Sequence, residues 1–344
     1  MNSTDCTISL MSQRDVDNFS HLIENQAHYW YPERTFLPFQ REILMFLFPT
    51  TVCFLAAILV TPPILFSIFS NFSMRQETRF LLLANALVFD LIYLFLYTAV
   101  SICNKTNMHI PKYICALLLF SLAATYGGGV LTSAGMVVDT YLAILWPLHY
   151  MILLPPSRTR KLIAFLWLSS CFFSGILFIV LHFTQKTVPC QPELCSLPVI
   201  LLMTLHGDKA IRLFHILFIA AFLLCFSVIL CCYLFLCYKT RESGMWKGAS
   251  SRANVTFLMH HLILASHFCP LLLLLAASLL YINHVIELKT GMQITLTICD
   301  VLLVLPKGVS PYLYGFRYRD IYKSLRLFCK FKRHRLVAPT QGYT

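Results

Sequence analysis

Charged residues inside the long apolar runs of this 344-residue sequence include Asp90, Asp300 and Lys307. An ionised side chain at membrane depth costs several kcal/mol unless it is paired or wet, so each is a candidate for function. Asp300 and Lys307 share the last apolar run, and a lysine there can pair with an acid on another run. The sequence therefore points to buried charge chemistry, whose geometry depends on the elements that carry these residues.

Those elements are predicted to be membrane helices. The chain is 58% hydrophobic and 12% charged, with a mean hydropathy of +0.70, whereas soluble domains carry about 25% charged residues. Apolar runs of about 20 residues are long enough to cross a bilayer as helices. We therefore predict an all-α membrane protein, a seven-transmembrane helix bundle. The seven runs are Glu42–Phe69, Phe80–Cys103, Tyr113–Trp146, Leu162–Phe183, Leu213–Tyr238, Phe257–Ile282 and Thr290–Gly315.

Basic residues near the helix ends predict the orientation. With the N-terminus outside, most of the 27 lysines and arginines fall on the inner side, as membrane proteins prefer. We expect an extracellular segment over 1–40, the membrane domain over 41–315 and a cytoplasmic tail over 332–344. The inner charge then faces anionic lipid, so the bilayer rather than nucleic acid is the expected partner.

A short amphipathic helix is predicted over 316–331, directly after the last apolar run. Phe316, Ile321, Leu325 and Phe328 recur at near-helical spacing opposite basic residues, which is typical of a helix lying on a membrane surface. Cys329 at its end is a candidate for palmitoylation, with an unmodified thiol as the alternative.

The outer side of the predicted topology carries sequons and cysteines. The sequons at Asn2, Asn18 and Asn104 fall outside, where glycosylation can occur. Five cysteines fall there too, and an extracytoplasmic face permits disulfides. An odd number leaves at least one without a partner in the chain. These cysteines are Cys6, Cys103, Cys115, Cys190 and Cys195.

A series of motifs in order along the chain resembles the rhodopsin-like (class A) G-protein-coupled receptors. The motifs are Asn85 with Asp90, Cys115 before the third helix, Asp139-Thr140-Tyr141, Trp167, Tyr233, Pro270, and Pro311 with Tyr314. Other segments, such as Leu305–Tyr314, resemble an orphan receptor of this family, and Cys195–Leu201 resembles the second outer loop of odorant receptors. The resemblance implies a plasma-membrane receptor for a small-molecule or peptide ligand, with a heterotrimeric G protein as partner.

The resemblance also implies a disulfide between Cys115 and Cys195 that holds an outer loop over the third helix. Two alternatives stay open. Cys190 could take the place of Cys195, or Cys190 and Cys195 could pair with each other.

Lys307 is the main departure from the family pattern. Family members commonly hold a sodium ion at the aspartate that corresponds to Asp90, and Gly129 stands where a third-helix side chain would help. Our hypothesis is that the Lys307 ammonium replaces the ion as a tethered counter-charge. The alternative is that Lys307 extends to the inner membrane interface.

The family's switch residues are also altered. Thr140 stands where the family has an arginine that contacts the G protein, so ordinary coupling is in question. Asp139 is then expected to find another partner. The resemblance assigns further transduction roles to Asp90, Lys307, Tyr141, Tyr233, Pro270, Pro311 and Tyr314.

The expected ligand pocket lies between the outer halves of helices 3, 5, 6 and 7. Phe268 stands at the family's tryptophan switch, and Leu122 replaces the acid that amine receptors carry on helix 3. Asp300 favours a ligand with a donor or a cation, unless it pairs with Arg212 or another neighbour. The candidate pocket residues are Leu122, Tyr126, His215, Phe268, Leu271 and Asp300.

Other functional classes find less support in the sequence. His267 could sense pH, although a hydrogen-bonded core histidine is the simpler interpretation, and the histidines of helix 6 lack metal-ligand spacing. A retinal photoreceptor would need its lysine near Val304, one turn from Lys307. A transporter would show an internal repeat, which we do not find. We expect no enzyme activity, cofactor or metal, and an odorant or chemosensory receptor is the main alternative to the orphan receptor.

Overall fold

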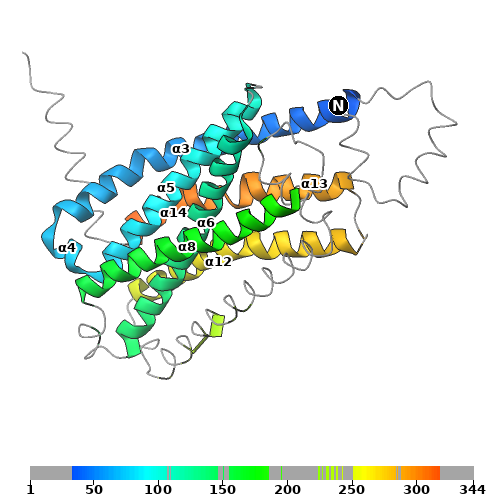
Figure 1. Cartoon of the computed structure of the whole chain (residues 1–344). Helices are drawn as coiled ribbons and strands as arrows, with labels where there is room; N and C mark the ends of the chain where they lie inside the picture. The colour runs from blue at the N-terminus through cyan, green and yellow to red at the C-terminus, as the bar shows by residue number, and fades with distance from the viewer. Residues whose placement is uncertain are drawn as a thin grey trace, which may run out of the picture.

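The computed structural model describes the backbone of residues 33–106, 108, 110–145, 150, 155–185, 195, 251–283, 285 and 288–317, with isolated positions between 224 and 242. All regular structure in these residues is helical (Figure 1). The helices cover six of the seven predicted runs. The fifth run, 213–238, lies outside the described residues apart from those isolated positions, and so does the predicted surface helix after residue 317.

The described helices begin and end close to the limits of the apolar runs, and most extend a few residues further. This is expected where a helix continues beyond the hydrocarbon into the interface. The elements are α3 (Glu33–Ser70), α4 (Phe72–Gln76), α5 (Thr78–Lys105), α6 (Lys112–Leu145), α8 (Pro156–Gln185), α12 (Ser251–Ile282), α13 (Leu288–Thr297), η1 (Ile298–Leu302) and α14 (Leu305–Arg317).

Four of these helical stretches are long and apolar enough to cross a membrane. They are Leu47–Ser70, Thr78–Lys105, Tyr113–Thr140 and Gln293–Gly315. Large apolar side chains such as Phe48, Leu59, Phe165 and Phe172 are exposed on the outside of α3 and α8. Bilayer hydrocarbon is the solvent that makes such an exposed surface favourable.

The last apolar run is not one continuous α-helix, which its composition had not indicated. It consists of α13, one π-helical turn η1, and α14. The amide of Leu303 donates to the carbonyl of Ile298 at 3.0 Å, five residues back. Pro306 supplies a reason for the interruption, because it has no N–H to donate to the carbonyl four residues earlier. The turn sets the rotation of Lys307 relative to Asp300.

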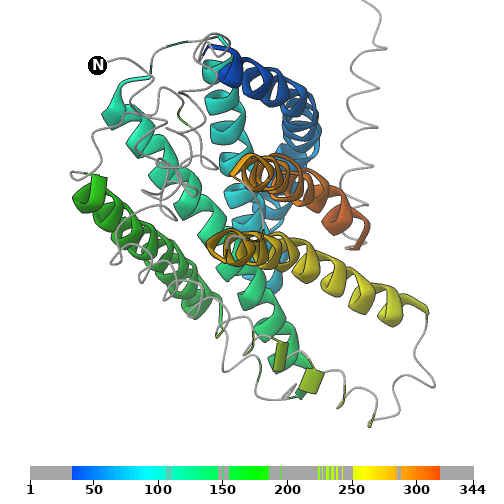
Figure 2. The same cartoon turned by 90° about the vertical axis from the view of Figure 1, so that its right-hand side faces the viewer.

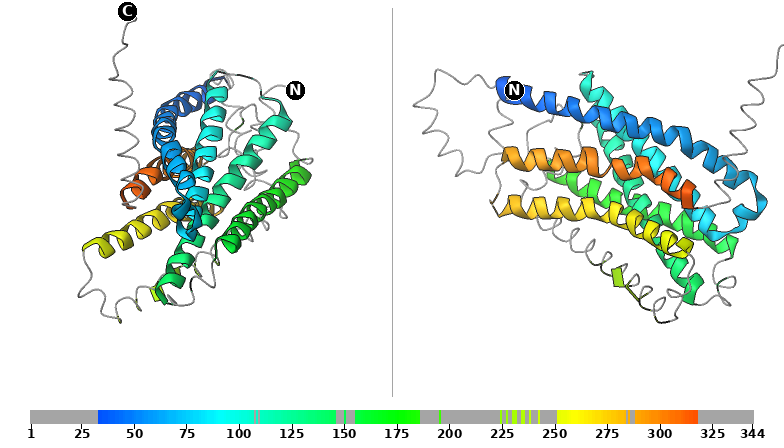
Figure 3. Two further views of the ribbon diagram at one scale, coloured as in Figure 1. Left: turned by 90° about the vertical axis from the view of Figure 1, so that its left-hand side faces the viewer. Right: turned by 180° about the vertical axis from the view of Figure 1, so that it is seen from behind.

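Helix α6 lies at the centre of the described bundle and contacts α5, α8 and α12 (Figure 2). On the other side, α14 packs against α3, α5 and α12. The right-hand view of Figure 3 shows α14 between α3 and α12, with α5 crossing behind. Two large apolar clusters and a small one fill the described interior. One large cluster surrounds Tyr314 and Leu82, the other surrounds Tyr97 and Cys195, and the small one consists of Val130, Val137 and Phe268. The Asp90–Lys307 pair lies between the two large clusters.

Candidate functional site

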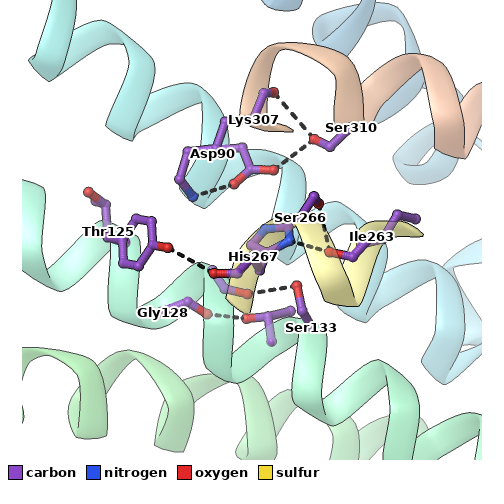
Figure 4. Close-up of polar contacts among 12 residues, drawn as sticks. Asp90, Thr125, Gly128, Ser133, Ile263, Ser266, His267, Lys307 and Ser310 are labelled. Carbon is purple, nitrogen blue, oxygen red and sulfur yellow. Dashed lines mark hydrogen bonds and ion pairs between the residues drawn. The ribbon is translucent and has the colours of Figure 1, made fainter. Parts of the chain in front are cut away.

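A buried ion pair joins α5 to α14. The Lys307 Nζ lies 2.8 Å from Asp90 Oδ1, and the Ser310 hydroxyl donates to Asp90 Oδ2 at 2.7 Å (Figure 4). Lys307 is 1% exposed and Asp90 is 2% exposed. Both carboxylate oxygens therefore have a donor, which a charge at this depth requires. Lys307 and Ser310 are three residues apart, one turn of α14, so one helix face presents both donors.

Two aromatic rings and a glycine complete the surroundings of the ammonium. The Nζ lies 4.9 Å from the ring centroid of Tyr93 and 4.8 Å from that of Tyr126, within the range of cation–π attraction. A Cβ built on Gly129 would lie 3.2 Å from Nζ and 3.5 Å from Asp90 Oδ1. The bare backbone at Gly129 thus leaves the space that the ammonium occupies.

Hydrogen bonds connect the surroundings of the Lys307 ammonium to α12. The Tyr126 hydroxyl donates to the carbonyl of His267 at 3.0 Å, and His267 Nδ1 lies 2.8 Å from the carbonyl of Ile263. His267 is buried and hydrogen-bonded, as the simpler interpretation of the sequence expected. Pro270 is buried inside α12. Helix α6 therefore contacts the ion pair and α12 through the same tyrosine.

A second acid lies on η1, toward α13 from Lys307. Asp300 accepts a hydrogen bond from the Tyr97 hydroxyl of α5. Tyr97 stacks on Tyr93, with ring centroids 5.6 Å apart, and Tyr93 packs against Tyr126 at 5.7 Å. The partner of Asp300 in the described structure is a tyrosine, and Arg212 lies outside the described residues.

The predicted pocket residues differ in exposure. Leu122 and Phe268 are buried in the apolar clusters, whereas Tyr126, Leu271 and Asp300 are half-buried. His215 lies outside the described residues. The structure thus brings Asp300 and Tyr126 near one aromatic group formed by Tyr93 and Tyr97, and it places Leu122 in the same cluster as these two tyrosines.

A disulfide joins the start of α6 to Cys195, with the partner at Cys115 and a Cα–Cα distance of 5.7 Å. This is the pairing that the resemblance implied. The Asn104 side-chain amide donates to the carbonyl of Cys195 at 2.8 Å, so the end of α5 holds the same residue. Cys190, Asn2 and Asn18 lie outside the described residues.

At the opposite end of α6, Asp139 accepts a hydrogen bond from the Tyr150 hydroxyl at 2.7 Å. Burial, and then this bond, raise the pKa of Tyr150. The Thr140 hydroxyl donates to the carbonyl of Met136 at 2.8 Å. Asp139 was expected to find another partner, and the Tyr150 hydroxyl is such a partner in the structure.

The structure describes some of the remaining predicted transduction residues. Pro311 and Tyr314 are buried in α14. Only the backbone of Tyr141 is described, and Tyr233 and Cys329 lie outside the described residues. Tyr93 and Tyr97 were not predicted from the sequence, and Ser310 was noted only as part of the segment Leu305–Tyr314. Helical spacing was the available signal for the two tyrosines, because they follow Asp90 by three and seven residues on one helix face.

Comparisons with known proteins agree with this arrangement. The family model "7 transmembrane receptor (rhodopsin family)" matches residues 62–314. The human protein named Probable G-protein coupled receptor 148 is 25% identical over 297 residues, 86% of each chain. The rat protein named Olfactory receptor 1 is 24% identical over 209 residues, 57% of this chain and 61% of that protein.

These matches confirm the resemblance, the seven-helix fold and the expectation that the chain is not an enzyme. The family match covers both residues of the ion pair and both cysteines of the disulfide. The chain belongs to the rhodopsin family of seven-transmembrane receptors, which are multi-pass membrane proteins of signal transduction.

Proposed function

We propose that this chain is a plasma-membrane receptor that binds a small-molecule or peptide ligand on its outer side and transmits the signal to a G protein. The family and the match to a G-protein coupled receptor support this proposal. We further propose that the N-terminus is extracellular, with the basic loops and tail in the cytoplasm.

The observation that carries the proposed mechanism is the Lys307–Asp90 pair, at 2.8 Å in the core. A diffusible ion can leave such a site when helices move, whereas a tethered ammonium moves only with its own helix. We infer that the pair holds α5 and α14 together in one state and that signalling requires α14 to move relative to Asp90. Two packed arrangements of one contact are what a conformational switch needs.

The proposed ligand site lies between the outer halves of helices 3, 5, 6 and 7. Asp300, Tyr126 and Leu271 are half-buried there, with Leu122 and Phe268 behind them, and His215 is the proposed contribution of helix 5. Asp300 and Lys307 belong to one interrupted helix. A ligand that displaces η1 therefore acts on the ion pair through α14.

The unusual feature of the proposed G-protein surface is Thr140, which stands where the family has an arginine. A threonine hydroxyl that donates to Met136 cannot supply the planar, charged fork of an arginine. We propose that coupling at this surface is weak or uses other residues, with Tyr150 holding Asp139 in the resting state.

Basal G-protein recruitment tests the proposal in cells that express each variant at equal surface level. Thr140→Arg should raise recruitment above wild type if the receptor scaffold is intact. Thr140→Lys, which adds charge without the planar fork, should raise it less, and Thr140→Ala should not. Equal recruitment in all four proteins would contradict a G-protein role for this surface.

An odorant or chemosensory receptor of the same fold is the second candidate. It rests on the match to the rat olfactory receptor and on the outer segment at Cys195. The two candidates predict different expression, in a chemosensory epithelium or in other tissues. Transcript localisation in the source organism decides between them.

A further inference from the structure

The acids Asp90 and Asp300 differ in how their charge is compensated. Asp90 has an ammonium and a hydroxyl as donors. Asp300 accepts from the Tyr97 hydroxyl, and among the described side chains no lysine, arginine or histidine forms a salt bridge with it. An acid at membrane depth without a counter-charge is costly. Of these two acids, Asp90 has a cation as partner, and Asp300 has none among the described residues.

The aromatic group beside Asp300 is suited to receive a cation. The rings of Tyr93 and Tyr126 already accept the Lys307 ammonium at 4.9 Å and 4.8 Å. Tyr97 continues the stack from Tyr93 to Asp300. Electron-rich ring faces beside a carboxylate are the surroundings that proteins use for organic ammonium groups.

A polar group in the same stack has no partner. Tyr93 is 0% exposed, and its hydroxyl forms no hydrogen bond within the described structure. Tyr93 lies one helical turn from Tyr97, and the two rings are nearly parallel, with 20° between their planes. Both side chains contact the last apolar run, Tyr97 at Asp300 of η1 and Tyr93 at Lys307 of α14. Burial of a hydroxyl without a partner is unfavourable, so a polar group of a ligand would gain by binding there.

Asp300 lies beside the apolar cluster that contains the disulfide cysteine Cys195. Asp300 is half-buried, unlike Asp90, and Tyr93 and Tyr97 belong to the apolar cluster that includes Cys195. Leu122 and Val304, both buried, are further apolar members of this cluster.

On the basis of the proposed receptor function, we propose that Asp300 is the anchor of a cationic ligand. The ligand class is an organic ammonium with an apolar or aromatic body. Its ammonium binds the Asp300 carboxylate beside Tyr97, and its body packs along the tyrosine stack. This places the acidic anchor on the seventh helix, while position 122 on the third helix carries a leucine.

The test uses the purified full-length receptor in lipid nanodiscs and a matched pair of probes. The amine is 2-phenylethylamine, and 2-phenylethanol is the neutral control of similar shape. Ligand binding raises the melting temperature once its concentration exceeds Kd. The wild type should show a saturable rise with the amine and a smaller rise or none with the alcohol.

Asp300→Asn is the informative variant, because asparagine retains an oxygen that can accept from Tyr97. It should weaken amine binding by roughly tenfold or more, as expected for loss of a charge-assisted contact. Without probe, its melting temperature should equal or exceed that of wild type, because an uncompensated buried charge has been removed. Asp300→Glu keeps the charge, so it should retain a measurable amine response.

Three outcomes would overturn the proposal. The first is that 2-phenylethylamine does not raise the melting temperature of the wild type. The second is that Asp300→Asn shows the same rise as the wild type. The third is that Asp300→Asn destabilises the probe-free protein, which would indicate an internal basic partner such as Arg212. G-protein recruitment by Thr140→Arg is measured in a separate experiment. Failure of the ammonium site and failure of the receptor function therefore give different results.

Discussion

At the scale of single residues, the unusual feature is a lysine that serves as a fixed counter-ion. Its ammonium is enclosed by Asp90, two tyrosine rings and the bare backbone of Gly129. Because the charge is covalently tethered, its local concentration does not depend on the salt outside. The site should therefore respond weakly to sodium.

Removal of one partner of this pair leaves an uncompensated buried charge. Lys307→Met should lower the free energy of unfolding by about 3–5 kcal/mol, and Asp90→Asn combined with it should recover part of the loss. Thermal unfolding of the purified proteins measures this, with Lys161→Met, an exposed lysine of α8, as control. If the single and double variants were equally unstable, the two charges would not be coupled.

At the scale of elements, close packing of α5 against α6 positions the ion pair. The ring of Phe89 lies where a Cβ on Gly128 would be, and the same ring stacks on Trp167 of α8 with centroids 4.0 Å apart. The Trp167 indole also donates to the Asn85 side chain at 2.9 Å. Three helices therefore meet at a glycine that keeps two of them in contact.

Two glycines of α6 make a matched pair for this packing. Gly128→Ala should destabilise the protein by about 1–3 kcal/mol, because the Phe89 ring would have to move in a filled core. Gly135→Ala should be neutral or slightly stabilising, because its Cβ would meet only Leu82 Cδ2 at 4.0 Å and alanine is the better helix former. Thermal unfolding of both variants checks this. Equal stabilisation of both variants would mean that helix propensity, and not the Phe89 contact, governs these sites.

The link between α5 and the disulfide gives a prediction about glycosylation. The Asn104 nitrogen that would carry a glycan donates to the carbonyl of Cys195. We expect glycan attachment to compete with this bond, so occupancy at Asn104 should be lower than at Asn2 and Asn18. Mass spectrometry after enzymatic deglycosylation in heavy-oxygen water measures each site. Full occupancy at Asn104 would show that the bond does not hinder modification.

At the scale of the whole molecule, two apolar clusters enclose a charged middle layer. The cluster around Tyr97 includes the disulfide at Cys195, and the cluster around Tyr314 lies on the other side of the Lys307–Asp90 pair. This layout matches a receptor that receives a signal at one end and releases it at the other. The orientation of the chain in the membrane then decides which end faces the outside of the cell.

Peptide tags at the two ends of the chain test that orientation. A tag before Met1 should bind antibody on intact cells, whereas a tag after Thr344 should bind only after the membrane is permeabilised, because most basic residues should remain inside. The reverse pattern would contradict the proposed N-terminus outside. Palmitate labelling of wild type against Cys329→Ser tests the proposed lipid anchor in the same cells.

Sequence alone determined the class of the molecule and the identity of its unusual residues. Apolar runs of bilayer length specify membrane helices because no other environment accepts them. The position of Lys307 four residues before Pro311 gave a register that directs both to one side of a helix. The hypothesis that Lys307 meets Asp90 came from that register together with the family resemblance.

The tertiary structure decided which groups surround each charge. Tyr97 and Asp300 are 203 residues apart in the chain, and Lys307 and Asp90 are 217 apart. Such contacts depend on how each helix is rotated and how closely it approaches its neighbours. The π-helical turn at Ile298–Leu302 alters that rotation within a single run, and hydrophobic patterning carries no signal for it. For this reason the sequence named the charges, and only the packing of helices showed that one acid has a cation and the other has a tyrosine.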